Sequence, residues 1–195
     1  MNTVCAQFLD WSSLVSAFIG GLLALFAVFF ADWLAKRKEK ENRREEIQAL
    51  IQSIKDEVGT LWGIYMNSAG KSLEELGESN PFNRYFPVTQ EYFTVYTSNA
   101  HKIGMIHDET LRKSIVETYS LGRSLIDTYR FNNELVRRCD NNAWMFHITK
   151  IPVYDELLKS SEKDLVEYSS SLKSIHMSFK EKVNKLLQEL SEYKA

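Results

Sequence analysis

The sequence predicts an all-α protein, with one N-terminal transmembrane helix that continues into a cytoplasmic bundle of long helices. Two observations lead to this expectation. The first is a run of eighteen uncharged residues from Leu14 to Ala31. The second is that most apolar residues after position 46 recur at intervals of three and four, which is the spacing of one helix face.

Residues 11–34 are the predicted transmembrane helix. They match the ~20 apolar residues needed to cross ~30 Å of hydrocarbon, and Trp11 and Trp33 lie where amphipathic rings favour the membrane interface. A buried core helix is a weaker alternative because the apolar run is long for one. A cleaved signal peptide is weaker too, because it needs basic residues before the run and residues 1–13 contain none.

The basic residues follow the span instead. Since cytoplasmic flanks carry an excess of Lys and Arg, this asymmetry predicts that residues 1–10 form a short extracytoplasmic tail and that the C-terminal part is cytoplasmic. Cys5 and Cys139 would then lie on opposite sides of the membrane, so no disulfide is expected. Four basic residues are candidates for binding anionic lipid headgroups: Lys36, Arg37, Lys38 and Lys40.

A stripe of small residues runs along the predicted span at steps of four and three. Small residues at one face let two helices approach closely in lipid, so this stripe predicts self-association. The alternative is that small residues are simply frequent in spanning helices. The candidate oligomerisation residues are Ser13, Ala17, Gly20, Ala24, Ala27 and Ala31.

Residues 35–66 are predicted to continue the same helix out of the membrane, first as a charged segment and then, from Ile47, as an amphipathic helix. No Gly or Pro occurs between Leu22 and Val58, so nothing in the sequence interrupts it.

Residues 67–195 are assigned to the helical bundle. The sequence predicts a long loop over 67–82, a helix over 88–98, a helix from about 109 to 138 capped by Asp108, and a last helix over 153–193 with a coiled-coil-like repeat. The segment 140–151 between the two long helices is the least periodic, and Trp144, Phe146 and Ile148 are predicted to lie in the core. Gly122 falls on a buried stripe, which predicts close approach of a neighbouring helix.

The sequence contains few residue patterns that are typical of a metal, cofactor or catalytic site. The four histidines and two cysteines do not have the spacing of a metal site, and no cofactor motif occurs. The near-neutral net charge of −2 argues against a broad nucleic-acid surface. Arg138 and His147 are weak catalytic candidates, since Arg can stabilise a phosphate charge while His transfers a proton. The competing interpretation is a solvated turn between helices.

The single span, the long basic-then-amphipathic helix and the run YFTVYTSNAHKIGMIHDETLRKSIVETYSLGRSLIDTYR at 92–130 resemble small membrane-anchored helical proteins of bacterial defence loci. One such group is the membrane accessory protein of type VI-B CRISPR systems. The resemblance implies a pore-forming oligomer in the bacterial inner membrane, with a cytoplasmic part similar to a diverged HEPN domain.

The sequence departs from HEPN ribonucleases in one respect. Those enzymes carry Arg, four to six residues and then His, whereas eight residues separate Arg138 from His147. The expected function is therefore that of a non-enzymatic, oligomeric membrane effector in antiviral defence. The alternatives are a membrane-tethered adaptor and a diverged ribonuclease. The expected partners are the lipid bilayer, further copies of the chain, and a protein or ribonucleoprotein on the cytoplasmic side.

Overall fold

The computed structural model describes residues 11–77, 79–88 and 91–193, and the described residues form helices and connecting segments without a β-strand. This confirms the all-α prediction. The chain divides into two compact units, Met1–Glu46 and Ile47–Ala195. The boundary falls inside the predicted 35–66 segment, at the point where buried apolar residues begin.

The described part of the first unit is one stretch of helix. It belongs to α1 (Trp11–Tyr65), and every side chain described over residues 14–46 is exposed. Charged neighbours one turn apart pair along it, with Lys36 Nζ 2.7 Å from Asp32 Oδ2 and Arg43 3.4 Å from Glu39. The predicted tail of residues 1–10 lies outside the described residues.

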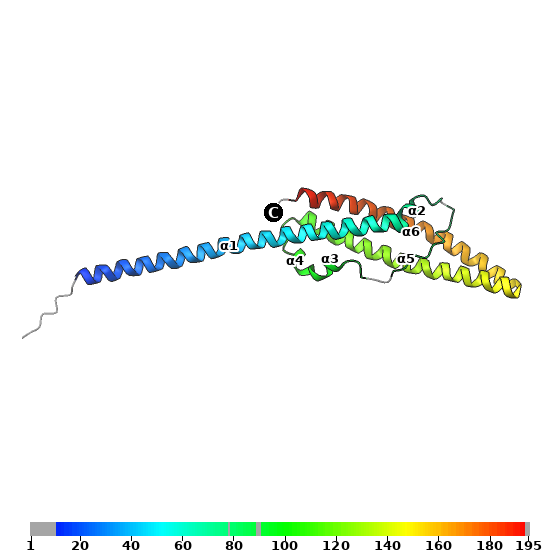
Figure 1. The fold of residues 1–195 in the computed structure, drawn as a ribbon, viewed down its shortest axis with the longest axis horizontal. Helices are drawn as coiled ribbons and strands as arrows, with labels where there is room; N and C mark the ends of the chain where they lie inside the picture. Colours follow the sequence, from blue (N-terminus) through cyan, green and yellow to red (C-terminus); the bar gives the residue numbers. More distant parts are fainter. Residues whose placement is uncertain (1–10, 78, 89–90, 194–195) are drawn as a thin grey trace, which may run out of the picture. The chain divides into compact units, whose positions relative to one another are not determined.

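The second unit is built on an antiparallel pair of long helices, α5 (Glu109–Thr149) and α6 (Pro152–Glu192), which run side by side in Figure 1. The turn between them is tight because Lys150 adopts the left-handed conformation (φ 54°) and Pro152 begins the next helix. The C-terminal part of α1 packs on this pair. The main core joins Ile54 of α1, Ile115 of α5 and Val183 of α6, each completely buried.

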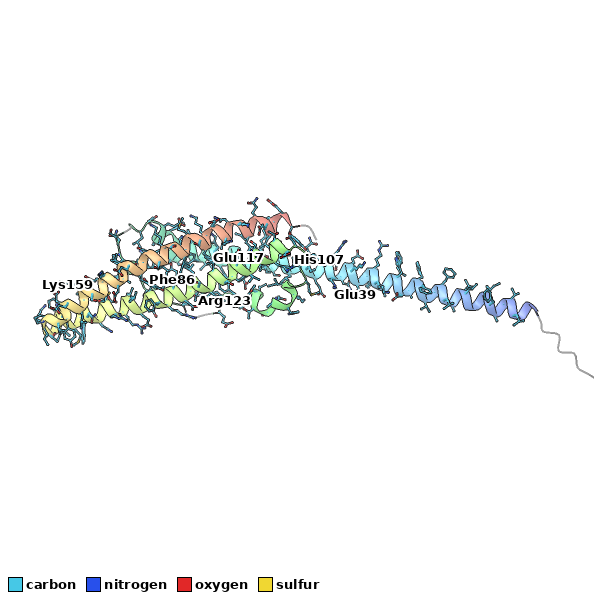
Figure 2. All side chains as sticks on the ribbon, turned by 180° about the vertical axis from the view of Figure 1, so that it is seen from behind. Glu39, Phe86, His107, Glu117, Arg123 and Lys159 are labelled. Atoms are coloured by element: carbon cyan, nitrogen blue, oxygen red, sulfur yellow. The ribbon has the colours of Figure 1, made fainter. Side chains whose placement is uncertain are left out.

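An irregular segment connects α1 to α5. It starts with a π-helical turn (Met66–Gly70) and α2 (Lys71–Glu74), and ends with the short helices α3 (Thr94–Ser98) and α4 (Ala100–Ile103). We call residues 75–93 the strap. Figure 2 labels Phe86 of the strap beside the long helices.

Two buried asparagines of α5 hold the strap. Asn133 accepts a hydrogen bond from the Phe86 backbone N–H (2.9 Å) and donates one to the Phe86 carbonyl (2.7 Å). Asn132 donates to the Phe82 carbonyl at 3.2 Å. These amides satisfy backbone groups that would otherwise be buried without partners. The element bounds differ from the prediction in two places. The predicted loop over 67–82 is partly helical, and the predicted helix over 88–98 forms only from Thr94.

The α5 helix is longer than predicted. It continues through residues 140–149 to Thr149, so the prediction that the helix ends near residue 138 was wrong. Trp144 and Ile148 are 61% and 58% exposed and are not core residues. The physical reason is visible in Figure 1, where the far end of the α5–α6 pair extends past the end of α1 and has no third helix to cover it.

The Asp108 cap is confirmed, and Gly122 is buried as predicted, although its close neighbours are aromatic side chains and not the backbone of a neighbouring helix. Asp108 caps α5 by accepting a hydrogen bond from the Leu111 backbone N–H at 3.0 Å. Gly122 is buried under two aromatic rings, since a Cβ atom there would lie 2.7 Å from Phe93 Cζ and 3.2 Å from Phe179 Cε2. The close neighbours are rings from the strap and from α6, and glycine leaves the room they occupy.

Candidate functional site

The apolar segment of α1 presents its side chains to the surroundings. Phe18, Phe26 and Phe29 are each at least 70% exposed, and among the described residues this is the one helix long and apolar enough to cross a membrane. Folding in water would leave this surface in contact with solvent, which is unfavourable in proportion to its area. The segment therefore has the composition and the exposure of a membrane anchor.

The predicted oligomerisation stripe lies on a regular helix. Ala17, Gly20, Ala24, Ala27 and Ala31 fall on one face of α1, whereas the side chain of Ser13 is outside the described residues. A Cβ atom added at Gly20 would meet nothing within 4 Å in this chain. The room beside the stripe is thus available to another helix, and self-association stays a prediction.

The predicted headgroup residues are exposed at the end of the apolar segment. They are Lys36, Arg37, Lys38 and Lys40. Lys36 pairs with Asp32, and the guanidinium carbon of Arg37 lies 5.7 Å from the centre of the Trp33 ring. Pairing and ring contact within the helix still leave the positive ends accessible to anionic lipids.

The structure does not bring Arg138 and His147 together. Both lie on α5, nine residues apart, which places them ~14 Å apart along the axis and on opposite sides of the helix. Arg138 lies 3.8 Å from Asp164, while His147 is exposed. In the described residues no group of acidic, histidine and cysteine side chains could hold a metal ion.

A buried polar network that the sequence analysis did not predict lies between α1, α2, α5 and α6. Its centre is His176, whose side chain is completely buried. Nδ1 of His176 lies 2.7 Å from the Tyr65 hydroxyl, which in turn lies 3.2 Å from the Tyr129 hydroxyl. Nε2 lies 3.0 Å from Glu74 Oε1, and that same oxygen accepts a hydrogen bond from Lys180 at 2.7 Å.

The charges of this network determine where its protons lie. The ammonium of Lys180 and the ring of His176 lower the pKa of Glu74, which is therefore an ionised acceptor. Nε2 of His176 must then donate to Glu74, so Nδ1 accepts from the Tyr65 hydroxyl. The Tyr65 oxygen accepts in turn from Tyr129, and every hydrogen bond of the series has one donor and one acceptor.

Burial shifts the pKa values of the other members. Desolvation lowers the pKa of His176 despite the nearby carboxylate, so the ring is neutral at pH 7. Desolvation also raises the pKa of Tyr65 well above its ordinary value and that of Tyr129 to about 12. The network therefore holds its members in single protonation states, and its geometry fits a structural role better than proton transfer.

A second, half-buried arrangement joins α1 to α3. The N-terminus of α3 has no capping side chain of its own, and Glu57 of α1 takes this role. Its carboxylate accepts hydrogen bonds from the backbone N–H groups of Val95 (2.7 Å) and Tyr96 (3.3 Å) and from the Tyr119 hydroxyl (2.7 Å). A carboxylate at a helix N-terminus is favourable for the helix dipole.

The sequence contained one signal for the His176 network. His176 lies four residues after Leu172 and three before Phe179, so it occupies a position of the apolar stripe of α6. A histidine at such a position needs partners when it is buried. The sequence could not identify those partners, because Tyr65, Glu74 and Tyr129 lie far from it along the chain.

Comparison with known proteins finds no matching family model, no matching curated protein and no matching solved structure. A function for this chain must therefore be argued from its own sequence and geometry.

Proposed function

We propose that this protein is a single-pass membrane protein, and that it self-associates and acts as a non-enzymatic effector. The observation that carries the proposal is the exposed apolar surface of α1 from Leu14 to Leu34. Every side chain described over residues 14–34 is exposed, and a bilayer would cover that surface along its whole length. The basic residues that come after this apolar segment support an orientation with residues 1–10 outside and the helical unit in the cytoplasm.

Orientation can be tested with the natural cysteines. In spheroplasts of cells that express the protein, a membrane-impermeant maleimide should label Cys5, and the Cys5→Ser variant should lose the label. Cys139 is buried and serves as the internal reference after denaturation and membrane disruption. Labelling of Cys5 only after the membrane is opened would contradict the orientation.

Self-association through the small-residue stripe is the second part of the proposal. Gly20→Leu and Ala24→Leu should each break the assembly, because a large side chain holds two backbones apart. A Cβ atom at position 20 would meet nothing within 4 Å in its own chain, so a loss of assembly would report contact with another molecule. Val15→Phe is the matched control, since Val15 lies on the opposite face of the helix.

Mass measurement of the full-length protein in nanodiscs is the experiment that tests this assembly. A single large species that the two stripe variants convert to monomer supports the effector proposal, and dye leakage from vesicles then tests whether it forms a pore. A wild-type monomer would refute self-association. The resemblance to accessory proteins of type VI-B CRISPR systems supports a role in antiviral defence, which plaque counts with and without the co-expressed CRISPR nuclease would test.

A membrane-tethered adaptor is the second candidate, and the uncovered end of the α5–α6 pair favours it. Trp144, Ile148, Val153 and Leu157 are between 46% and 61% exposed there. Apolar side chains gathered at one place on a surface are typical of protein-binding sites. Trp144→Glu with Ile148→Glu should abolish function without loss of membrane insertion or assembly if this end binds a partner. Retained function in that double variant would exclude the adaptor role of this surface.

A further inference from the structure

A cavity of about 390 Å³ lies inside the second unit. We call it the aromatic cavity. Its walls come from α1, the strap, α5 and α6 and include Trp62, Phe86, Phe93, Leu125, Ile126 and Phe179. Its size is within the range of pockets that hold small ligands. Ile64, which is 61% exposed, lies at its open side.

Most of the hydroxyl groups that line the aromatic cavity are already used by the protein; among the described lining residues only the Tyr92 hydroxyl has no hydrogen bond. Tyr65 and Tyr129 belong to the His176 network, and Tyr119 donates to Glu57. Thr118 donates to the Ser114 carbonyl, and Ser68 donates to the Tyr65 carbonyl. None of the described lining residues is charged. A ligand inside the cavity would therefore find apolar contact and few available hydrogen-bond partners.

The backbone at Gly122 shapes one wall of the cavity. A Cβ atom there would displace the rings of Phe93 and Phe179, both of which line the cavity. Glycine thus allows these rings to pack directly on α5. Tyr119 and Tyr129 of the lining are buried, whereas Ile64 and Ser68 of the lining are exposed, so the cavity has a buried side and an open side. This suits a molecule with one apolar end and one polar end.

We propose that the aromatic cavity binds the hydrocarbon chain of an amphipathic lipid, with the polar end of the lipid left at the open side. The lining disfavours charged and strongly hydrogen-bonding ligands, because their polar groups would lose water and gain few partners. A hydrocarbon chain gains free energy from leaving water and needs no such partner. Two sources share this chemistry, a free fatty acid and the acyl chain of a phospholipid. The phospholipid source rests on the proposed membrane anchor.

Photocrosslinking of the full-length protein in nanodiscs tests the inference. In one arm the probe is a diazirine-bearing palmitic acid, and in the other it is a phosphatidylcholine whose acyl chain carries the same diazirine. Peptide mapping by mass spectrometry should place crosslinks on cavity residues such as Leu61, Tyr92 and Ile126. Crosslinks within residues 14–34 form a separate readout, which reports on the membrane span.

Cavity-filling variants make the test specific. Ile126 is half-buried at the cavity, so Ile126→Trp fills space from a position that tolerates a larger side chain. Leu61→Trp fills the cavity from the α1 side and serves as a second variant. Val116→Trp is the matched control, because Val116 is 44% exposed on the same helix and outside the cavity. Circular dichroism should confirm that each variant is folded.

We expect either folded cavity variant to reduce crosslinking of cavity peptides by at least about fivefold, with no change in Val116→Trp. The arm in which cavity peptides are crosslinked identifies the source of the hydrocarbon chain, which is a free fatty acid, a phospholipid or both. Labelling of 14–34 without labelling of the cavity would overturn this inference and leave the membrane proposal intact. Cavity labelling by the fatty acid without labelling of 14–34 by the phospholipid would support this inference and contradict the membrane proposal.

Discussion

Nδ1 of His176 lies 2.7 Å from the hydroxyl oxygen of Tyr65, at the point where α1 and α6 pack together. The indole ring of Trp62 stacks on the imidazole, with 6.0 Å between the ring centres. The hydrogen bond therefore lies inside an aromatic cluster, where a partner that is lost cannot be replaced easily by water.

Removal of the Tyr65 hydroxyl should destabilise the helical unit. Tyr65→Phe leaves Nδ1 of His176 without its donor and the Tyr129 hydroxyl without its acceptor. We expect the free energy of unfolding to fall by about 1–3 kcal/mol, which is the usual cost of buried polar groups left unpaired. Thermal unfolding followed by circular dichroism in detergent micelles measures the change.

Tyr85→Phe is the control for this variant, because Tyr85 is 63% exposed. It should alter the stability by less than about 0.5 kcal/mol. Equal effects of the two substitutions would show that the network does not contribute to stability.

His176 should make the stability depend on pH below neutrality. Its ordinary pKa is 6.5, and burial lowers the pKa in the folded state. As the pH falls through about 6.5, the unfolded chain takes up a proton before the folded chain does, so stability is lost progressively. The pKa of Glu74 is also lowered from its ordinary 4.5, and its contribution is lost only at more acidic pH.

The unfolding midpoint between pH 7.5 and pH 5 tests this dependence. His176→Gln keeps an N–H group near Glu74 and removes the titrating ring, so its midpoint should vary less than that of the wild type over the same range. A wild-type midpoint that stays constant from pH 7.5 to pH 5 would be inconsistent with a neutral, buried His176.

Glu57 should hold α3 in place. In Glu57→Ala the backbone N–H groups of Val95 and Tyr96 and the Tyr119 hydroxyl all lose their acceptor. We expect a loss of about 2–3 kcal/mol, because hydrogen bonds to a charged group are involved. Hydrogen–deuterium exchange of residues 94–98 should increase more than that of the α5 core.

The neighbouring Asp56→Ala is a matched control, since Asp56 is exposed and its carboxylate accepts a hydrogen bond from the Gln52 side chain one turn away. It should leave exchange over residues 94–98 unchanged. If both variants increased exchange equally, the cap supplied by Glu57 would not be what holds α3.

Arg138 and His147 should be dispensable. Both are on the surface of α5 and on opposite sides of it, so the double variant Arg138→Ala, His147→Ala should change stability by less than about 0.5 kcal/mol. We also expect purified wild-type protein and the double variant to leave a labelled single-stranded RNA equally intact. RNA cleavage by the wild type that disappears in His147→Ala would instead support the ribonuclease alternative.

The sequence predicted those elements whose apolar pattern is long and regular. The α1 and α6 helices and the Asp108 cap follow from residues close together in the chain. The sequence did not predict the course of the strap, because its backbone is held by Asn132 and Asn133, about 50 residues further on. The helix over 109–149 was predicted to end near residue 138 because an uncovered helix lacks the apolar stripe that a covered helix needs.

The sequence by itself determined the helical class, the apolar segment and the positions of the long helices. These properties depend on local composition and on the 3.6-residue period, which a single chain segment carries. Only the tertiary structure decided that Tyr65, Glu74, Tyr129 and His176 share one network, and that aromatic rings from four segments enclose a cavity. Those relationships arise from the packing of segments distant in sequence, and no local pattern specifies which side chains will meet.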